Sequence, residues 1–351
     1  MKNPVVVVFV KNLTSGGAEK QAVMLANALH DAGINVEFAV FNAAHVHQKM
    51  RDMLSDAVPF TAFEGKLRQR YSLFEEFLKS RDVNVIFSYL TAANAIAMAA
   101  APQGTRVVTG LRCSRLSLHK HIIDAVASRL AAATVANSHS GCNWFTSKGF
   151  PKQKVEVIHN FIDPIHPYEA HAAGERVNVV CVGRFVPIKD LPTAIEAFGL
   201  ASKCDVPMRL TLVGYGPLEK SLRELVKRRG LDDSVEFVIN PPNVEAYERH
   251  ADIFLMTSKA EGLSNAIMEA MNADLPIVAT KVGDADAMVK DGDNGILVQP
   301  GDVNSIAVAL VELAADPDRR ARMGFRSKEI LRQHFGREVF TRRYLDLLER
   351  L

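Results

Sequence analysis

The chain has 351 residues, of which 48% are hydrophobic and 23% are charged, and its formal net charge is +2. This composition is typical of a globular protein long enough for two domains, and the small net charge gives no indication of nucleic-acid binding. The charge is unevenly distributed, because residues 1–165 carry a net charge of +6 and residues 166–351 a net charge of −4.

The cysteines and the apolar runs indicate the compartment. The four cysteines are far apart and form no Cys-x-x-Cys pair, which favours a reducing environment. The longest apolar runs, Val5–Val10 and Ala95–Ala101, are too short to span a bilayer. We therefore expect a cytoplasmic protein, or one attached peripherally to the inner face of a membrane.

The first half of the chain alternates between strand and helix patterns. Val5–Val10 is a continuous β-branched run, typical of a buried parallel strand. A helical pattern follows and ends at Gly33, and Val36–Phe41 is the next predicted strand. Further strands are expected at Val85–Ser88, Arg106–Thr109, Thr134–Ala136 and Val155–Ile158.

The same alternation restarts after a segment rich in proline, glycine and polar residues, Asp163–Gly174, which we interpret as a linker. Strands are then expected at Val177–Val182, Arg209–Val213, Val235–Ile239, Ile253–Met256, Ile277–Ala279 and Gly295–Val298. The predicted fold is α/β, with two tandem Rossmann-like, doubly wound domains at residues 1–165 and 175–336 and a cleft between them as the default ligand site.

Two glutamates are the strongest chemical signal. Glu261 and Glu269 flank the expected start of a helix near Leu263. Free amides at such a helix start suit a diphosphate, and a carboxylate beside them suits sugar hydroxyls. Taken alone, two glutamates at this spacing are more typical of a solvated surface helix.

A second motif, Gly183–Asp190, follows the strand Val177–Val182. Arg184 and Lys189 therefore lie on a loop at the carboxyl edge of the sheet, where α/β proteins bind ligands. Two cations there would stabilise the charge that develops on a diphosphate leaving group. A solvated basic loop is the less attractive alternative.

A third motif, Ser15–Glu19, follows the first predicted strand. Its glycines allow a ligand to approach the backbone closely. It lacks the G-x-G-x-x-G spacing of a dinucleotide fingerprint, so a tight turn without a ligand is an equal alternative.

These motifs and the loop Gly214–Pro217 occur in a fixed order at predicted strand ends, and the ordered set resembles the retaining glycosyltransferases of family 4. That family has the GT-B fold and a Glu-x7-Glu pair. The resemblance extends over nearly the whole chain through Asn137-Ser138, Asn160–Asp163 and Asp291–Gly295. It implies that the second domain holds most of the nucleotide-sugar donor, and that a C-terminal helix from about Arg337 to Leu351 crosses back onto the first.

The resemblance also implies residue roles. Arg184 and Lys189 would hold the donor diphosphate, Glu261 would face the donor sugar, and Glu269 would bind the ribose. The other expected donor contacts are Gly16 and Gly17 in the first domain, Gly214, the base-bordering Ile239, Asn240 and Val244, and the amide-bearing Gly262, Leu263, Ser264 and Asn265.

One departure from the family concerns the residue beneath the donor sugar. Many relatives carry a histidine after the strand that is Arg106–Thr109 here, whereas this chain has Arg112 nearest to that position. We treat Arg112 as a candidate residue at the anomeric centre or the acceptor.

A second departure concerns metal. The chain has Gly283-Asp284-Ala285-Asp286-Ala287 where the family usually has Gly-Gly-x-Pro-Glu, and the two aspartates at this spacing could suggest a divalent cation. Because the resemblance implies that Arg184 and Lys189 supply the positive charge, we expect no metal and no other cofactor.

The implied enzyme is a hexosyltransferase-type glycosyltransferase. It would move a sugar with retention from a nucleotide diphosphate sugar, with UDP as the expected nucleotide, to a glycan or a polyprenyl-pyrophosphate-linked acceptor in cell-surface polysaccharide synthesis. Two alternatives remain open: a nucleotide-sugar epimerase of the same fold, and a non-catalytic sugar-nucleotide-binding subunit.

Two basic clusters in the first half contain interleaved apolar residues, namely Lys66, Arg68 and Arg70 with Leu67 and Tyr71, and Arg112, Arg115 and Lys120 with Leu116 and Leu118. Such surfaces suit an anionic membrane. A solvated basic face that serves a soluble acceptor is the alternative, and both remain open.

Overall fold

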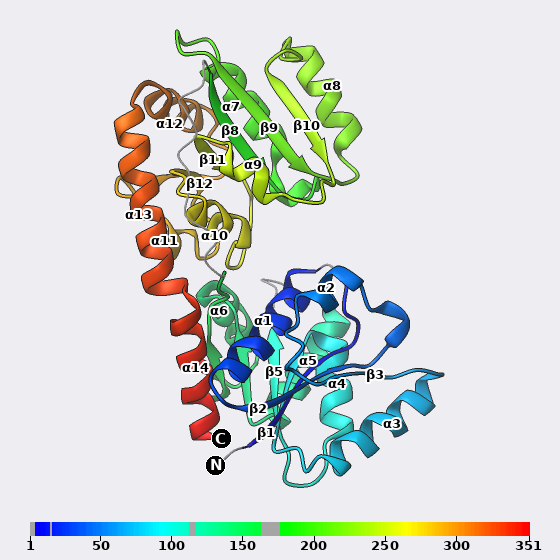
Figure 1. The fold of residues 1–351 in the computed structure, drawn as a ribbon. Coiled ribbons are helices and arrows are strands. Elements are labelled where there is room, and N and C mark those ends of the chain that lie inside the picture. The colour runs from blue at the N-terminus through cyan, green and yellow to red at the C-terminus, as the bar shows by residue number, and fades with distance from the viewer. Residues whose placement is uncertain (1–3, 15, 112–116, 163–175) are drawn as a thin grey trace. The chain divides into compact units, whose positions relative to one another are not determined.

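The computed structural model describes residues 4–14, 16–111, 117–162 and 176–351. The chain forms two compact units: unit 1 comprises Met1–Phe161 and Arg337–Leu351, and unit 2 comprises Ile162–Gly336. Each contains a parallel sheet with helices on both faces (Figure 1). The division after Phe161 lies slightly before the boundary expected at residue 165, and the expected linker lies entirely outside the described residues.

Among the described residues, unit 1 has a seven-stranded sheet in the order β3-β2-β1-β4-β5-β6-β7. Its elements are β1 (Val5–Val10), α1 (Gly17–Asp31), β2 (Asn35–Val40), α2 (Gln48–Asp52), β3 (Phe60–Ala62), α3 (Leu67–Ser80), β4 (Val85–Tyr89), α4 (Thr91–Ala100), β5 (Arg106–Leu111), α5 (Leu118–Leu130), β6 (Ala133–Ala136), α6 (His139–Ser147), β7 (Val155–Val157) and α14 (Arg337–Arg350).

Within the described part of unit 2, six parallel strands follow the order β10-β9-β8-β11-β12-β13. The elements are β8 (Val177–Val182), α7 (Leu191–Ala201), β9 (Met208–Gly214), α8 (Glu219–Arg229), β10 (Val235–Ile239), α9 (Glu245–Arg249), β11 (Ile253–Met256), α10 (Asn265–Asn272), β12 (Ile277–Thr280), α11 (Ala285–Met288), β13 (Gly295–Val298), α12 (Val303–Ala315) and α13 (Pro317–Phe335).

Strand β1 shows why the central strands are apolar throughout. Val6 and Val8 point into a core shared with α1 and α14, whereas Val7 and Phe9 point into a second core shared with α3 and α4. Because helices cover both faces, alternate residues of the strand are buried on opposite sides. The strands expected from the sequence are all present, with end points that differ by at most two residues.

Strand β3 was not expected. It has only three residues, Phe60–Ala62, and pairs with β2 at the edge of the sheet. Three residues are too few to show a two-residue alternation, so its position depends on the neighbouring strand.

Helix α14 completes the core of unit 1. Phe340, Tyr344, Leu347 and Leu348 are all at most 5% exposed and pack with residues of α1 and β1. Their spacing places them on one helix face, so the last 15 residues of the chain are part of the unit formed by the first 161.

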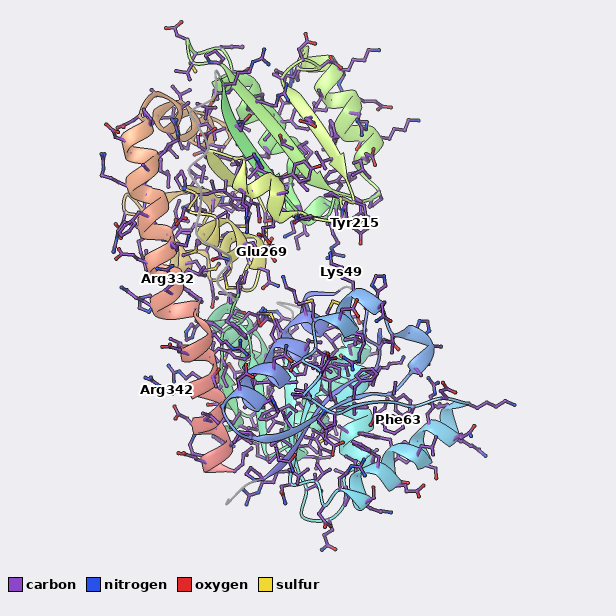
Figure 2. All side chains as sticks on the ribbon, in the orientation of Figure 1. Lys49, Phe63, Tyr215, Glu269, Arg332 and Arg342 are labelled. Carbon is purple, nitrogen blue, oxygen red and sulfur yellow. The ribbon has the colours of Figure 1, made fainter. Side chains whose placement is uncertain are left out.

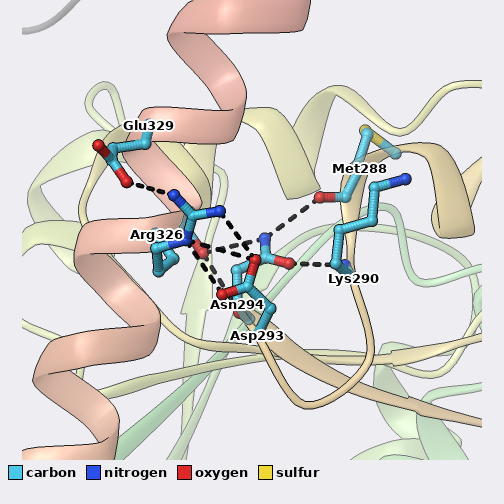
Figure 3. A network of polar contacts seen from close by, with 7 residues as sticks. Met288, Lys290, Asp293, Asn294, Arg326 and Glu329 are labelled. Atoms are coloured by element: carbon cyan, nitrogen blue, oxygen red, sulfur yellow. Dashed lines mark hydrogen bonds and ion pairs between the residues drawn. The ribbon is translucent and has the colours of Figure 1, made fainter.

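Polar contacts tie the turn before β13 to α13 (Figure 3). Arg326 donates from Nε and Nη2 to the two carboxylate oxygens of Asp293, each at 3.0 Å, and lowers the pKa of that carboxyl. Buried Asn294 donates to Met288 O at 3.1 Å and accepts from Lys290 N at 2.6 Å. This turn is part of the family-like stretch Asp291–Gly295, and its contacts give it a structural role in positioning α13.

Across the described residues, no helix is both long enough and apolar enough to cross a bilayer.

Candidate active site

The candidate site lies at the switch point of the unit 2 sheet. Strands β8 and β11 are neighbours, but the chain continues from β8 toward β9 on one side and from β11 toward β12 on the other. The loops that follow β8 and β11 therefore diverge from the same edge, which is the position at which doubly wound sheets bind ligands. The motif Gly183–Asp190 and the residue Glu261 lie on these two loops.

Three side chains meet at this edge. Lys189 Nζ lies 2.6 Å from Glu261 Oε1, and Ser258 Oγ donates to the same oxygen at 2.6 Å. The side chains of Lys189 and Glu261 are 20% and 15% exposed, so the pair is partly shielded but still open to a ligand. The sequence singled out the two charged residues; Ser258 was missed, although its place two residues after β11 was a usable signal.

Backbone contacts lock the two loops together. Thr257 Oγ1 donates to the carbonyls of Lys189 and Asp190 at 3.1 and 3.0 Å, and Lys259 N donates to Ile188 O at 2.8 Å. Asp190 has a φ of +48° and accepts from Lys259 Nζ at 3.0 Å. The position of Lys189 is therefore set by the β11 loop as well as by its own loop.

A third loop, after β9, packs against the first. Gly214 has a φ of +150°, and a Cβ there would lie 1.9 Å from the carbonyl oxygen of Gly183. Gly183 N donates to Val213 O at 3.0 Å and Phe185 N to Tyr215 O at 2.8 Å. Glycine at 214 thus permits a close backbone approach that holds the first motif in place.

Arg184 is exposed, and within the described residues it makes no hydrogen bond or ion pair. It is on the same loop as Lys189, whose charge is already compensated by Glu261. An uncompensated guanidinium at a strand end is available to an anionic ligand.

Helix α10 begins at Asn265, two residues later than expected. The reason is Ser264, whose side chain accepts from Ile267 N at 3.4 Å and caps the helix. Gly262 and Leu263 lie in the loop before the cap, at the end of α10 toward which the amides of its first turn point. Glu269 is partly exposed and lies in the second turn (Figure 2).

Next to this loop, the two aspartates of the Asp-x-Asp pattern have different environments. Asp284 is 3% exposed and its N–H donates to Gly262 O at 3.0 Å, whereas Asp286 is exposed on α11. Gly283 has a φ of +58°, and a Cβ there would lie 2.4 Å from that same carbonyl. Backbone packing against the Glu261 loop thus sets the conformation of Gly283 and Asp284.

The residues expected to border a base lie at the end of β10. Ile239 is 39% exposed, and Asn240 has a φ of +46° with its N–H donating to Gly214 O at 3.2 Å. Val244 precedes α9 and is partly buried. Tyr215, which was not singled out from the sequence, is 54% exposed beyond β9 (Figure 2).

Behind the site, Cys181 is buried on β8. Burial raises the pKa of its thiol to about 12, although the Lys189 ammonium acts to lower it. The thiol is therefore neutral at physiological pH and is a poor nucleophile.

The candidates in unit 1 lie at the carboxyl end of β1. Gly16 caps α1 and Gly17 is its first residue. A Cβ on Gly16 would lie 2.3 Å from Oε2 of Glu19, whose other carboxylate oxygen, Oε1, accepts from Thr14 Oγ1 at 3.0 Å. Arg112 lies outside the described residues.

Two protein-family profiles match the chain. "Glycosyltransferase Family 4" matches residues 15–165, and "Glycosyl transferases group 1" matches residues 176–316. The chain belongs to the family 4 glycosyltransferases. This family 4 glycosyltransferase is accordingly a transferase enzyme.

Its relatives include two lipopolysaccharide core biosynthesis glycosyltransferases of Rhizobium meliloti. It is 30% identical to LpsE over 202 residues, which cover 56% of this chain and 58% of LpsE. It is 27% identical to LpsD over 354 aligned positions, which cover 96% of both chains.

Among solved structures, the glycosyltransferase is similar to Anabaena HepE in complex with UDP. The TM-score is 0.86 with 20% identity, over 99% of this chain and all of that one. The likeness shows the fold: two Rossmann-like parallel-sheet domains of the GT-B type.

Proposed function

We propose that this glycosyltransferase moves a sugar from a UDP-sugar, with retention, to a glycan or polyprenyl-pyrophosphate-linked acceptor in cell-surface polysaccharide synthesis. The observation that carries the donor assignment is the 2.6 Å contact between Lys189 and Glu261 beside the exposed Arg184. The lipopolysaccharide core relatives support the acceptor class, and HepE, which was solved with UDP and with UDP-glucose, supports the nucleotide.

In this proposal the two cations bind the donor diphosphate. Arg184 is already uncompensated, whereas Lys189 would exchange part of its contact with Glu261 for a phosphate oxygen. Amides at the start of α10 and the positive end of the helix would add to the attraction. Together they would stabilise the negative charge that develops as the bond between the sugar and the diphosphate breaks.

Glu261 would orient the donor sugar. The hydrogen bonds that it accepts from Lys189 and Ser258 both reach Oε1. No described residue donates a hydrogen bond to Oε2, so this oxygen can accept one from a sugar hydroxyl. Glu269 would bind the ribose, and the exposed edge formed by Ile239, Asn240 and Val244 would border the base.

Retention would follow from a front-face reaction. The bond from the anomeric carbon to the leaving phosphate oxygen breaks, and the acceptor oxygen bonds to the same face. The acceptor proton passes to the leaving diphosphate, so no protein nucleophile or separate base is required. Arg184 and Lys189 would balance the diphosphate charge in place of a metal. Arg112, Gly16 and Gly17 stay candidates for the acceptor side and the donor cleft.

A panel of UDP-, GDP- and ADP-sugars tests the donor. A bound donor stabilises the native state by mass action, so the melting temperature should rise most with a UDP-sugar. The preferred donor is then incubated with candidate acceptors, and the anomeric configuration of the product is determined by NMR.

Three outcomes contradict the proposal. A preference for a GDP- or ADP-sugar would contradict the nucleotide, and an inverted product would contradict retention. Conversion of the donor sugar into its epimer without an acceptor would assign the epimerase alternative. Donor binding with no chemistry for any acceptor would favour a binding subunit.

The proposal also locates the enzyme peripherally at the inner face of a membrane. The net charge of +6 over residues 1–165 supports this location, because the cytoplasmic leaflet is negatively charged. A lipid-linked acceptor would be found at the same surface.

A further inference from the structure

Helix α5 carries its large apolar side chains on the outside of unit 1. Leu118, Ile122 and Val126 are 76%, 54% and 51% exposed, and Leu130 and Ile123 are 68% and 41% exposed. Residues three to four positions apart share a helix face, so these five side chains form one continuous surface. We call it the α5 stripe.

The side of α5 that faces unit 1 consists of small and polar residues. Ala125 and Ser128 are buried there, and buried Asp124 accepts from Thr91 Oγ1 at 2.6 Å and Asn94 Nδ2 at 2.9 Å. The usual arrangement, in which large apolar residues face the core, is therefore reversed. A contiguous apolar surface of this kind marks an interaction site.

The charge around the stripe is positive. Between Ser117 and Lys154 the chain has five lysines and arginines and a single acidic residue, Asp124, which is 2% exposed. The cations are Lys120, Arg129, Lys148, Lys152 and Lys154.

The segment 148–154 borders α5 directly. His121 Nε2 lies 3.1 Å from Lys148 O, and Arg129 Nη2 donates to Gly149 O at 2.8 Å. Lys154 Nζ donates to the carbonyl of Arg129 at 2.7 Å. Arg129 and Lys154 bond to neutral carbonyl oxygens, and no carboxylate among the described residues pairs with either of them. Both therefore add uncompensated positive charge beside the stripe.

We propose that the α5 stripe and these cations attach the protein to an anionic lipid bilayer, with the stripe inserted among the headgroups. Apolar side chains bordered by lysine and arginine are the surface that such insertion requires. The inference rests on the membrane location in the proposed function and not on its sugar chemistry.

Two observations favour a bilayer at α5 over the alternatives. A second copy of the chain docked on the stripe about a twofold axis would bring the same five cations together, and the segment 117–154 has no exposed acidic residue to pair with them. On α3, where the sequence predicted a basic cluster, fewer apolar side chains can insert: Leu67 and Leu73 are exposed, but Phe74 and Phe77 are buried. Two acidic residues, Glu75 and Glu76, follow them.

Vesicle flotation tests the stripe. The full chain should float at low salt with vesicles of phosphatidylcholine containing about 30% phosphatidylglycerol, and not with phosphatidylcholine alone. The double variant Ile122→Gln/Val126→Gln should bind the anionic vesicles at least about tenfold more weakly. Leu67→Gln is the matched control, because Leu67 is 63% exposed but lies on α3; it should bind as the wild type does.

Two further variants separate charge from insertion. Lys120→Glu/Lys152→Glu should weaken flotation most at low salt, where charges are least screened. Val126→Trp, in a Trp144→Phe background that removes the only native tryptophan, should show a blue-shifted emission with anionic vesicles. An unshifted emission would contradict insertion.

The remaining outcomes are equally decisive. If the wild type binds anionic vesicles and Ile122→Gln/Val126→Gln binds them as well, the stripe is not the attachment site, although a membrane location stands. If the wild type never binds, both the inference and the location fail. A concentration-dependent dimer that the stripe variant abolishes, with no vesicle binding, would assign the stripe to a second copy.

Donor-induced thermal shifts on the same variants report the sugar chemistry independently.

Discussion

Lys189 Nζ lies 2.6 Å from Glu261 Oε1, and the two residues are 72 positions apart in the sequence. Side chains that are 20% and 15% exposed are still partly screened by water, so the pair adds little to stability. Its consequence is positional, because each charge holds the other at the switch point. A diphosphate ligand would compete with the carboxylate for the ammonium and would leave the carboxylate free to accept from hydroxyls.

Lys189→Ala should lower turnover by about a hundredfold or more, the usual effect of losing one charge-stabilising group. Release of nucleotide diphosphate at saturating donor measures it. Lys259→Ala is the matched control, since Lys259 is also paired, with Asp190, but its side chain is 60% exposed; its turnover should stay close to that of the wild type. Near-normal turnover in Lys189→Ala would remove Lys189 from the donor site.

Glu261→Gln should abolish transfer but preserve binding of the nucleotide diphosphate product. The amide keeps the shape of the carboxylate and loses its charge, so contacts to sugar hydroxyls weaken while the phosphate contacts remain. Calorimetric titration with the nucleotide and a transfer assay measure the two effects separately. If nucleotide binding disappears together with transfer, Glu261 has a structural or nucleotide-binding role instead.

Activity should survive an excess of EDTA. Asp284 is buried against the Glu261 loop and Asp286 is exposed, so the two carboxylates are not in equivalent positions for one cation. Asp286→Asn should retain wild-type turnover, with and without added Mn²⁺. Loss of activity in EDTA that Mn²⁺ restores would show that the metal alternative was wrongly set aside.

Gly214→Ala should destabilise unit 2 by about 2 kcal/mol or more, because the new Cβ meets a backbone carbonyl at 1.9 Å in a strained φ region. Gly230→Ala is the control. Gly230 also has a positive φ, of +64°, but a Cβ there meets nothing within 4 Å. A loss of about 1 kcal/mol in the free energy of unfolding is therefore expected. Scanning calorimetry compares the two variants, and equal losses would mean that the close approach at Gly214 contributes nothing.

Asp124→Asn should remove a pH-dependent cost in unit 1. Burial raises the pKa of the Asp124 carboxyl, and hydrogen bonds from Thr91 and Asn94 only partly oppose it. The folded state therefore holds the proton more tightly than the unfolded state, and the wild type loses stability as the pH rises above about 4. Trp144, in unit 1, is the single tryptophan of the chain and reports urea unfolding. The stability of Asp124→Asn relative to the wild type should increase from pH 4 to pH 7; parallel curves would contradict the buried charge.

The sequence was informative wherever a local pattern has a single structural meaning. Val5–Val10 can be apolar at every position only if both faces of the strand are covered, so a parallel sheet with helices on both sides follows from that run. Gly183–Asp190 directly follows a strand, so the sequence alone assigns Arg184 and Lys189 to the carboxyl edge of the sheet. Short or capped elements were less accessible: β3 depends on its neighbour, and the start of α10 depends on the cap at Ser264.

By itself, the sequence determined the alternation of strands and helices, the α/β class and the charged residues at two strand ends, because these depend on contacts a few residues apart. Only the tertiary structure decided that Ser258 joins Lys189 at Glu261, that Gly214 packs on Gly183, and that α5 exposes its large apolar residues. The helical spacing of α5 is compatible with either face pointing inward. The choice depends on long-range contacts, here those of Asp124 with α4, and no local pattern records which segments of the chain will meet.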